Sequence, residues 1–267
     1  SVLLPSPKPT PRRGIYDRTT RGIRIYLATP RLRGLLSLNL AAAAAGAMVL
    51  VNTVVLVRSN LGLGDTQVAV ALGTFGGGSM LAAFLLPRLL DNRPDRPVII
   101  GGAAVLVISL LSFSLTSLIY DMQWLPLLAG WFIIGIGYSV VLIPSGRLLK
   151  RSAHAEDRPA VYAAQFALSH ACWLVTYPLA GWLITAAGPT TAFAILAVLA
   201  AAGMISGIAL WTPDDTGTFE HTHDDLSDDH PHVRDGRSHR HPIVIDDFHH
   251  HWPRIREPET GQHSSGR

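Results

Sequence analysis

Polar side chains interrupt one long apolar stretch of the chain, Pro159 to Ala187. The stretch carries no Asp, Glu, Lys or Arg, and it is long enough to cross a bilayer as a helix. Hydrocarbon would reject polar groups there, because each one left unpaired costs free energy. We therefore expect its polar face to meet other protein or a watery cavity. Spacings of four, three and four residues place one stripe of side chains on that face of a helix: Gln165, Ser169, Cys172 and Thr176. A neighbouring stripe consists of His170, Trp173 and Tyr177.

His170 is the residue of this stretch best suited to chemistry, because an imidazole changes its charge near neutral pH. Inside a membrane helix a histidine is either a proton relay or ligand, or a neutral residue bonded to a neighbouring helix, and the sequence leaves both open. His170 and Cys172 are two residues apart and so do not face each other on a helix. The sequence contains no His-Glu-x-x-His, Gly-x-Ser-x-Gly or phosphate-binding loop. We expect no enzyme activity and no required cofactor.

Six apolar stretches, each about as long as a bilayer core requires, occupy the middle of the chain. They lack the charged face of a helix in a soluble bundle, and charged residues make up only 15% of the sequence, against the usual quarter. The sequence predicts an all-α membrane protein with six transmembrane helices in residues 34–212, a basic linker in residues 1–33 and a polar, disordered tail in residues 213–267. The predicted spans are Leu35 to Val57, Val68 to Leu90, Val98 to Ile119, Trp124 to Leu149, Pro159 to Ala187 and Thr191 to Trp211.

Basic residues alternate strictly between the connections of these spans. They cluster before the first span and after the second and fourth, whereas the other three connections hold Arg58 alone. The positive-inside rule then places both ends of the chain in the cytoplasm, as an even number of spans also requires. We expect Asn60 and Met122 outside the cell and Asn92 and Ser152 inside it, with the protein in the plasma (inner) membrane.

Two segments leave alternatives open. Asn39 and Thr53 are fourteen residues apart, almost four whole turns, and so share one face of the first span. They either line a cavity or make hydrogen bonds between helices. Before that span, residues 22–27 carry apolar side chains between arginines, and they form either a short amphipathic piece on the membrane surface or a solvated part of the linker.

The connection between the second and third spans, Pro-Arg-Leu-Leu-Asp-Asn-Arg-Pro-Asp-Arg from Pro87 to Arg96, resembles a loop of the major facilitator superfamily, Gly-x-x-x-Asp-Arg-x-Gly-Arg-Arg/Lys. Asp91 and Arg96 match the motif, and the chain departs from it at both glycines and at two basic positions. The loop also stands where the family has it, after the second of six spans on the predicted cytoplasmic side. A carboxylate close to arginines at the end of a helix could join helices, and we assign this role to Asp91 and Arg96.

The resemblance covers about Gly22 to Trp211, and it implies that the chain corresponds to helices seven to twelve of a twelve-helix transporter. It also implies that substrate binds near the middle of the membrane, between this half and an N-terminal half that the chain lacks. We expect the partners to be the lipid bilayer, that N-terminal half and a small molecule or ion, and we expect no nucleic acid. The expected cavity residues are Gln165, Ser169, His170, Cys172, Thr176, Asn39 and Thr53.

Histidine and aspartate are concentrated in the tail that follows the sixth span. His-x-His occurs four times there, and residues two apart lie on the same side of an extended chain. Imidazole suits zinc, nickel and copper, and carboxylates can complete the shell of such an ion. The alternative is a polar tail that binds nothing. We favour weak binding of Zn²⁺, Ni²⁺ or Co²⁺ at His221, His223, His230, His232, His239, His241, His249 and His251.

The sequence thus predicts a secondary active transporter that works in export, of which this chain is the C-terminal half. One alternative is a divalent-metal efflux carrier that uses the histidine-rich tail, because some nickel-exporting facilitators resemble this chain in carrying such a tail. A second alternative is a membrane anchor that transports nothing and presents a metal-binding tail.

Overall fold

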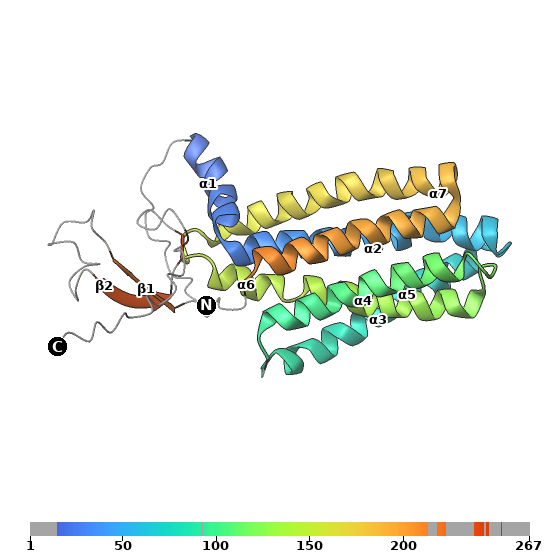
Figure 1. Ribbon diagram of the computed structural model, residues 1–267, viewed down its shortest axis with the longest axis horizontal. Coiled ribbons are helices and arrows are strands. Elements are labelled where there is room, and N and C mark those ends of the chain that lie inside the picture. Colours follow the sequence, from blue (N-terminus) through green and yellow to red (C-terminus); the bar gives the residue numbers. More distant parts are fainter. Residues whose placement is uncertain are drawn as a thin grey trace, which may run out of the picture.

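The computed structural model describes residues 15–91, 93–212, 218–222, 238–242, 244–245 and 252. Helices dominate the described part, and two short strands follow them (Figure 1). The elements are α1 (Ile15–Ala28), α2 (Pro30–Val55), the π-helical turn η1 (Leu56–Asn60), α3 (Asp65–Asp91), α4 (Asp95–Thr116), α5 (Trp124–Leu142), α6 (Ser145–Arg151), α7 (Arg158–Leu210), β1 (Thr218–Thr222) and β2 (Ser238–Pro242).

Five helices of the described part are long and apolar enough to cross a membrane, and the last of them makes two passes. Helix α7 bends at Gly188, whose φ of 80° lies in the left-handed region that a glycine adopts without a steric penalty. Pro189 follows and fits the first turn of the returning arm. The first arm (158–187) and the second arm (189–210) therefore run in opposite directions, as Figure 1 shows. The predicted all-α membrane protein with six spans is confirmed.

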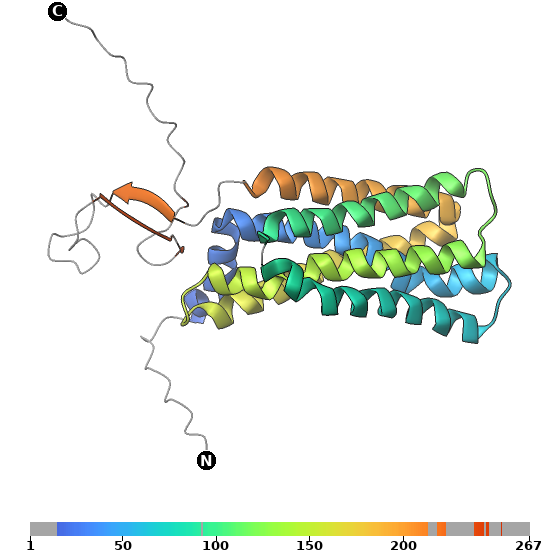
Figure 2. The same ribbon diagram turned by 90° about the horizontal axis from the view of Figure 1, so that it is seen from below.

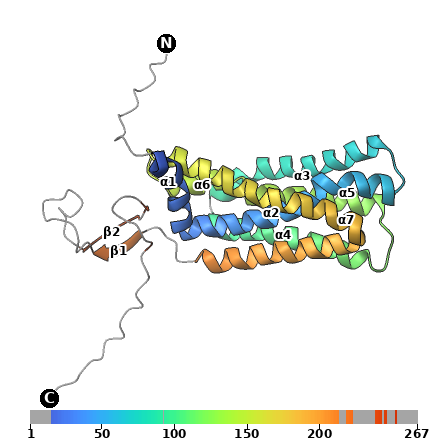
Figure 3. The ribbon, with the colours of Figure 1, turned by 90° about the horizontal axis from the view of Figure 1, so that it is seen from above.

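Helix α2 is the centre of the bundle and runs between the two arms of α7 (Figure 3). Its alanine-rich middle, residues 41–47, is buried along its whole length. Small side chains let neighbouring helices approach closely, which is how helices pack where lipid supplies no hydrophobic driving force. The same device joins α3 and α5, because a Cβ on Gly78 would lie 2.0 Å from the Phe132 carbonyl oxygen and one on Gly135 would lie 2.1 Å from that of Phe75.

Residues 1–33 were assigned to a linker with an amphipathic piece at residues 22–27 as one alternative, and the structure has helix α1 in this segment. It packs across the start of α7, where a Cβ on Gly22 would lie 2.0 Å from the Ala160 carbonyl oxygen. Arg21 donates to Asp157 through Nε at 2.5 Å and Nη2 at 2.8 Å, and both side chains are buried. Two apolar side chains of α1, Ile25 and Tyr26, are buried against the bundle, whereas Ile23 and Leu27 are exposed. The membrane-surface alternative for residues 22–27 stays a prediction, because Ile23 and Leu27 are left uncovered.

Strands β1 and β2 lie beyond the same end of the bundle as α1 and α6 (Figure 2). Strands β1 and β2 pair in antiparallel register, so ten residues of the tail that was predicted to be disordered form a hairpin. After β2 the chain returns to the helices, since Ile245 is buried in the hydrophobic core and Trp252 packs against it.

Candidate functional site

An open hollow of about 540 Å³ lies on the first arm of α7, inside the span that sequence analysis singled out. Its polar and aromatic lining comes from His170, Trp173 and Tyr177, which form the second of the two predicted stripes. Ala167, Ala171, Leu174 and Pro178 complete the lining. A single helix arm therefore presents a histidine and two aromatic rings on an uncovered face.

His170 is exposed at this hollow. Its Nδ1 lies 2.8 Å from the carbonyl oxygen of Phe166, one turn earlier, and its ring lies over the Phe166 ring with centroids 3.9 Å apart. A carbonyl oxygen can only accept a hydrogen bond, so in this arrangement Nδ1 carries the proton. In the neutral imidazole Nε2 is then an acceptor.

Aromatic rings at the base of the hollow pack against α2 and α5. Trp173 meets Tyr138 of α5 edge to face at 5.9 Å, and its ring also lies 5.0 Å from that of Tyr177. Gly46 of α2 gives these rings their room, because a Cβ there would lie 3.0 Å from Trp173 and 3.1 Å from Tyr138. A larger residue at position 46 would displace both rings.

The first predicted stripe, one step around the helix, divides into residues with partners and one without. Gln165 is half-buried and accepts a hydrogen bond from the Tyr26 hydroxyl of α1. Burial raises the pKa of Tyr26 above its usual value, so the hydroxyl stays protonated as a donor. Ser169 bonds back to the Phe166 carbonyl oxygen at 3.1 Å, and Cys172 Sγ lies 3.6 Å from the carbonyl oxygen of Leu168.

Thr176, the last member of that stripe, is fully buried, and its hydroxyl has no hydrogen-bond partner among the described residues. It lies one turn before Ala180, whose carbonyl oxygen accepts from Asn52 Nδ2 at 3.1 Å across the contact with α2. The Oδ1 atom of Asn52 also lacks a partner in the described part. Asn52, which the sequence did not suggest, therefore belongs with Thr176 at the contact between the first and fifth spans.

Asn39 and Thr53 differ although they share one helix and are both buried. Thr53 accepts a hydrogen bond from Trp131 Nε1 of α5 at 2.7 Å and donates to the Val49 carbonyl oxygen. Neither amide atom of Asn39 has a partner in the described part of the chain. Thr53 thus makes the interhelical bond that was one of its two alternatives, and Asn39 is left with an unsatisfied amide.

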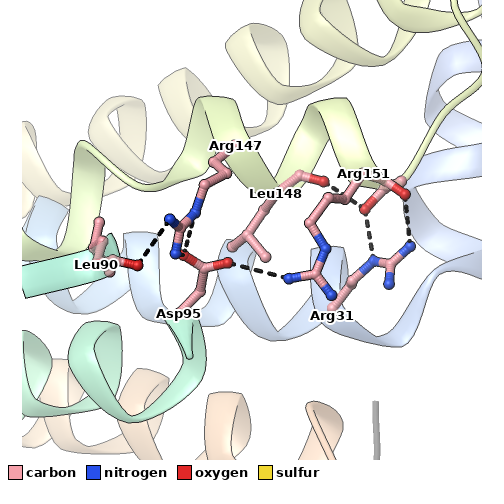
Figure 4. A network of polar contacts seen from close by, with 7 residues as sticks. Arg31, Leu90, Asp95, Arg147, Leu148 and Arg151 are labelled. Atoms are coloured by element: carbon pink, nitrogen blue, oxygen red, sulfur yellow. Dashed lines mark hydrogen bonds and ion pairs between the residues drawn. The ribbon is translucent and has the colours of Figure 1, made fainter. Parts of the chain in front are cut away.

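A charge network joins helices at the end of the bundle that carries α6, which we call the basic end (Figure 4). Its centre is Asp95, the first residue of α4, which is only 2% exposed. Arg147 of α6 donates to Asp95 Oδ1 through Nε at 2.8 Å and through Nη2 as well. Its Nη1 bonds the Leu90 carbonyl oxygen at 3.1 Å, and Arg151 Nη1 lies 3.4 Å from Asp95 Oδ2. The network links the second, third and fourth spans.

Arg31 extends this network to the start of α2. It is buried, and it donates from Nε to Ser152 Oγ at 2.7 Å and from Nη2 to the Arg151 carbonyl oxygen at 3.0 Å (Figure 4). Its guanidinium carbon also lies 5.3 Å from the centre of the Trp252 ring, a cation–π distance. The returning tail therefore touches the network directly.

The two motif residues have different places. Arg96 donates to the Trp211 carbonyl oxygen at 2.5 Å and to that of Ile208 at 3.2 Å, so it caps the second arm of α7 and joins the third span to the sixth. Asp91 is exposed and takes part in none of the ion pairs of the described chain. The joining role expected of Arg96 is present, whereas the carboxylate of the network is Asp95 in place of Asp91.

Three of the eight histidines predicted to bind metal lie in the hairpin, namely His221, His239 and His241. The other five, His223, His230, His232, His249 and His251, lie outside the described residues. Where the structure describes side chains, no three His, Cys, Asp or Glu residues gather in a way that could hold a metal ion.

Comparison with known families settles the class of the protein. The model of the Major Facilitator Superfamily matches residues 35–243, which includes all six spans and continues into the tail. The chain belongs to this superfamily. Its members are membrane transporters, so this facilitator chain contacts the bilayer and serves the transport of a small-molecule substrate. No protein in the curated collection that was searched matches it.

Proposed function

We propose that this facilitator chain is one six-helix half of a secondary active transporter, and that the hollow on the first arm of α7 is part of its substrate cavity. The observation that carries the proposal is the exposure of His170 within a bilayer-crossing helix. Lipid-facing positions of such a helix are apolar, because hydrocarbon cannot satisfy an imidazole. An exposed His170 beside Trp173 and Tyr177 therefore suits a surface that meets water, substrate or a second protein unit.

The partner of that surface is a second unit of six helices. In transporters built from repeats, substrate sites lie near the middle of the membrane between such units. One wall cannot enclose a cavity, so we expect the chain alone not to transport. Sustained transport by the isolated chain in vesicles, with crosslinking that finds no dimer, would contradict this expectation.

Chemical accessibility tests the cavity without knowledge of the substrate. In a Cys172→Ser background of the full-length protein, His170→Cys should react with a charged, water-soluble thiol reagent in cell membranes. Val198→Cys is the matched control, because Val198 is also exposed but lies on the second arm of α7, expected to face lipid. A thiol in hydrocarbon does not ionise and stays unreactive. Equal resistance of both positions would show that His170 faces lipid, and the cavity assignment would fail.

The basic end lies on the cytoplasmic side of the plasma membrane in this proposal, which the alternation of basic connections supports. An impermeant thiol reagent applied to intact cells should label Asn60→Cys and leave Lys150→Cys untouched. Both positions are exposed, whereas Ser152 is fully buried and would resist the reagent on either side. Labelling of Lys150→Cys from outside would show that the basic end faces the outside of the cell, and the proposed orientation would be wrong.

We propose that the transporter works in export. A second candidate function is the export of a divalent metal. The observation in its favour is the position of the histidine-bearing hairpin at the basic end, where cytoplasmic metal would reach it (Figure 2). Metal tolerance of cells that make the full-length protein, with and without residues 213–267, tests this candidate. If removal of the tail leaves metal tolerance unchanged, the metal-export candidate loses its support, and the proposal of a general transporter stands without it. Absence of any transport by the complete protein in vesicles would favour the membrane-anchor alternative.

A further inference from the structure

An open groove of about 290 Å³ follows the seam between α4 and α5, which pack against each other (Figure 1). It begins near the basic end, at Arg93 in the connection before α4, and reaches Val105 of α4 and Ile136 of α5. Among the described residues that line it, Arg93 alone carries a charge, and the others are aliphatic residues, glycine and proline. The groove therefore joins an apolar floor to one cation at its mouth.

Glycines at the helix crossing shape this groove. A Cβ on Gly102 would lie 2.7 Å from Val140 of α5, and one on Gly137 would lie 3.0 Å from the Gly102 carbonyl oxygen, so the two backbones approach closely. Gly101 lies next to this contact, and it lines the groove and is exposed. A Cβ on Gly101 would meet no atom within 4 Å. The groove is thus open at Gly101, where a side chain of another residue would fill it.

The length of the groove suits one leaflet of a bilayer. Its lining on α4 extends from Pro97 to Val105, a rise of about 12 Å along the helix, and half of the hydrocarbon core measures about 15 Å. A second hollow of about 420 Å³ continues from Val105 along the same two helices, and its described lining is without a charged residue. At the far end of the seam a third hollow has the carboxylate of Asp121 in its lining. Only the segment at the basic end thus offers a cation.

Arg93 is available for an anion from outside the chain. It is exposed and takes part in none of the ion pairs among the described residues. Its neighbours at the basic end are engaged, because Arg96 caps the second arm of α7 and both Arg147 and Arg151 contact Asp95. A guanidinium group presents a planar set of donors that can bind two oxygens of one phosphate. Arg93 stands just before α4 enters the membrane, at the depth of the lipid headgroups.

We infer that this groove is a binding site for an anionic glycerophospholipid. Arg93 holds the phosphate of the lipid, and one acyl chain lies along α4 and α5 as far as Val105. Basic residues beside grooves between membrane helices attract anionic headgroups in this way. A zwitterionic lipid has the same phosphate but adds a cation that Arg93 repels, so it binds more weakly. The inference requires only that the chain crosses the bilayer, and it is independent of the substrate cavity and of the direction of transport.

Lipid retention by the full-length protein in detergent tests the role of Arg93. Phosphatidylglycerol and phosphatidylcholine with identical acyl chains are added separately, and native mass spectrometry measures the bound fraction of each. We expect a preference of about fivefold for phosphatidylglycerol, the factor that one basic residue near anionic lipid contributes. Arg93→Gln should reduce the preference to less than twofold. Arg88→Gln is the matched control, because Arg88 is an exposed arginine at the end of α3 that does not line the groove. Equal effects of both variants would show a general surface charge, and the inference would be wrong.

Filling the groove tests the place of the acyl chain. Gly101→Leu puts a side chain into the groove and leaves Arg93 in place, so it should lower retention of phosphatidylglycerol at least fivefold. Gly73→Leu is its control, because Gly73 of α3 is also exposed, has no atom within 4 Å of a Cβ and lies outside the groove. Neither leucine meets a clash at its Cβ, and thermal unfolding verifies that both variants fold. Undiminished retention by a folded Gly101→Leu variant would show that no chain lies in the groove.

Two further measurements separate a lipid site from its alternatives. Glycerol phosphate has the charged group without the chains and should not displace the bound lipid. Displacement by it at equal concentration would mean that Arg93 binds free phosphate, and the lipid assignment would fail. A phosphatidylglycerol with a photoreactive diazirine in its acyl chain should crosslink chiefly to residues 97–105 of α4 and 136–140 of α5. Crosslinks spread evenly over α3 and the second arm of α7 would show lipid that covers the bundle without a site.

Discussion

The basic end and the interior of the bundle satisfy their polar groups in opposite ways. At the basic end, Asp95 has two arginines, Arg31 has two oxygen acceptors and Arg96 has two carbonyl oxygens. In the interior of the bundle, buried polar atoms of the described chain lack partners: both amide atoms of Asn39, Oδ1 of Asn52 and Oγ1 of Thr176. The polar groups of the first region are paired, whereas the second region contains buried polar atoms without a described partner.

An unsatisfied buried group costs about 1–3 kcal/mol, so it calls for a compensating role. A transporter supplies one, because its helices rearrange and admit water and substrate from one side of the membrane at a time. We interpret the unpaired atoms of Asn39, Asn52 and Thr176 as groups that find their partners when the cavity is open.

Asp95→Asn is the change expected to destabilise the protein most. It removes the charge that Arg147 and Arg151 share, while Arg147 keeps its bond to the Leu90 carbonyl oxygen. Breaking a buried ion pair costs about 3–5 kcal/mol and an exposed pair at most about 1. Because the side chain of Asp95 is buried and those of the arginines are about half exposed, we expect roughly 2 kcal/mol. Thermal unfolding in detergent measures the change.

Asp91→Asn is its matched control, since it removes a carboxylate from the same connection. Surface substitutions of this kind stay within about 0.5 kcal/mol. An equal loss of stability in both variants would show that the network does not centre on Asp95.

His170→Ala and Gln165→Ala test the other region. In the full-length protein both should lower transport, by about tenfold for His170, which corresponds to about 1.4 kcal/mol of lost interaction. Neither should lower the amount of protein in the membrane to the same degree, because His170 is exposed and Gln165 only half-buried. Transport rates divided by membrane expression give the comparison. If both variants transport normally, the stripe is structural and the hollow is not the cavity.

Asn39→Leu and Thr53→Val should change stability in opposite directions. The first replaces an amide without partners and should raise stability by about 1 kcal/mol, while the second removes the bond from Trp131 and should lower it by about 1 kcal/mol. Asn39→Leu should also slow transport if the amide meets water or substrate in the open state. Thermal unfolding and transport are measured on the same preparations. A destabilised Asn39→Leu variant would mean that Asn39 has a partner in this state.

The six spans could be predicted because hydropathy and length depend on each segment alone. Even the bend of α7 has a local cause, the Gly188–Pro189 step between two apolar stretches. The predicted polar stripe also holds locally, since His170 and Trp173 line one hollow. In each of these cases the prediction rests on the pattern of residues along a single helix.

The contacts between distant segments could not be predicted in the same way. Motif matching chose Asp91, yet Asp95 follows Pro94 at the start of α4 and meets Arg147, 52 residues later in the chain. The packing of α1 could not be predicted for the same reason, because its ion pair with Asp157 depends on how α7 begins. Asn39 and Thr53 look equivalent on a helix, and only the position of Trp131 tells them apart.

Trp252→Ala should have the smallest effect on the basic end, and its outcome decides whether the tail belongs to the network. The ring contributes one cation–π contact to Arg31, worth about 0.5–1 kcal/mol at a partly exposed site. Arg31 keeps its bonds to Ser152 and to the Arg151 carbonyl oxygen, so the thermal unfolding temperature of the helices should fall by only a few degrees at most. The tail should be held less tightly nevertheless, and limited trypsin digestion at Arg240 should become faster than in the unchanged protein. Trp182→Ala is the matched control, because Trp182 is exposed on the first arm of α7, away from this end. Equal digestion rates in all three proteins would show that Trp252 does not hold the tail, and the basic end would then consist of helices alone.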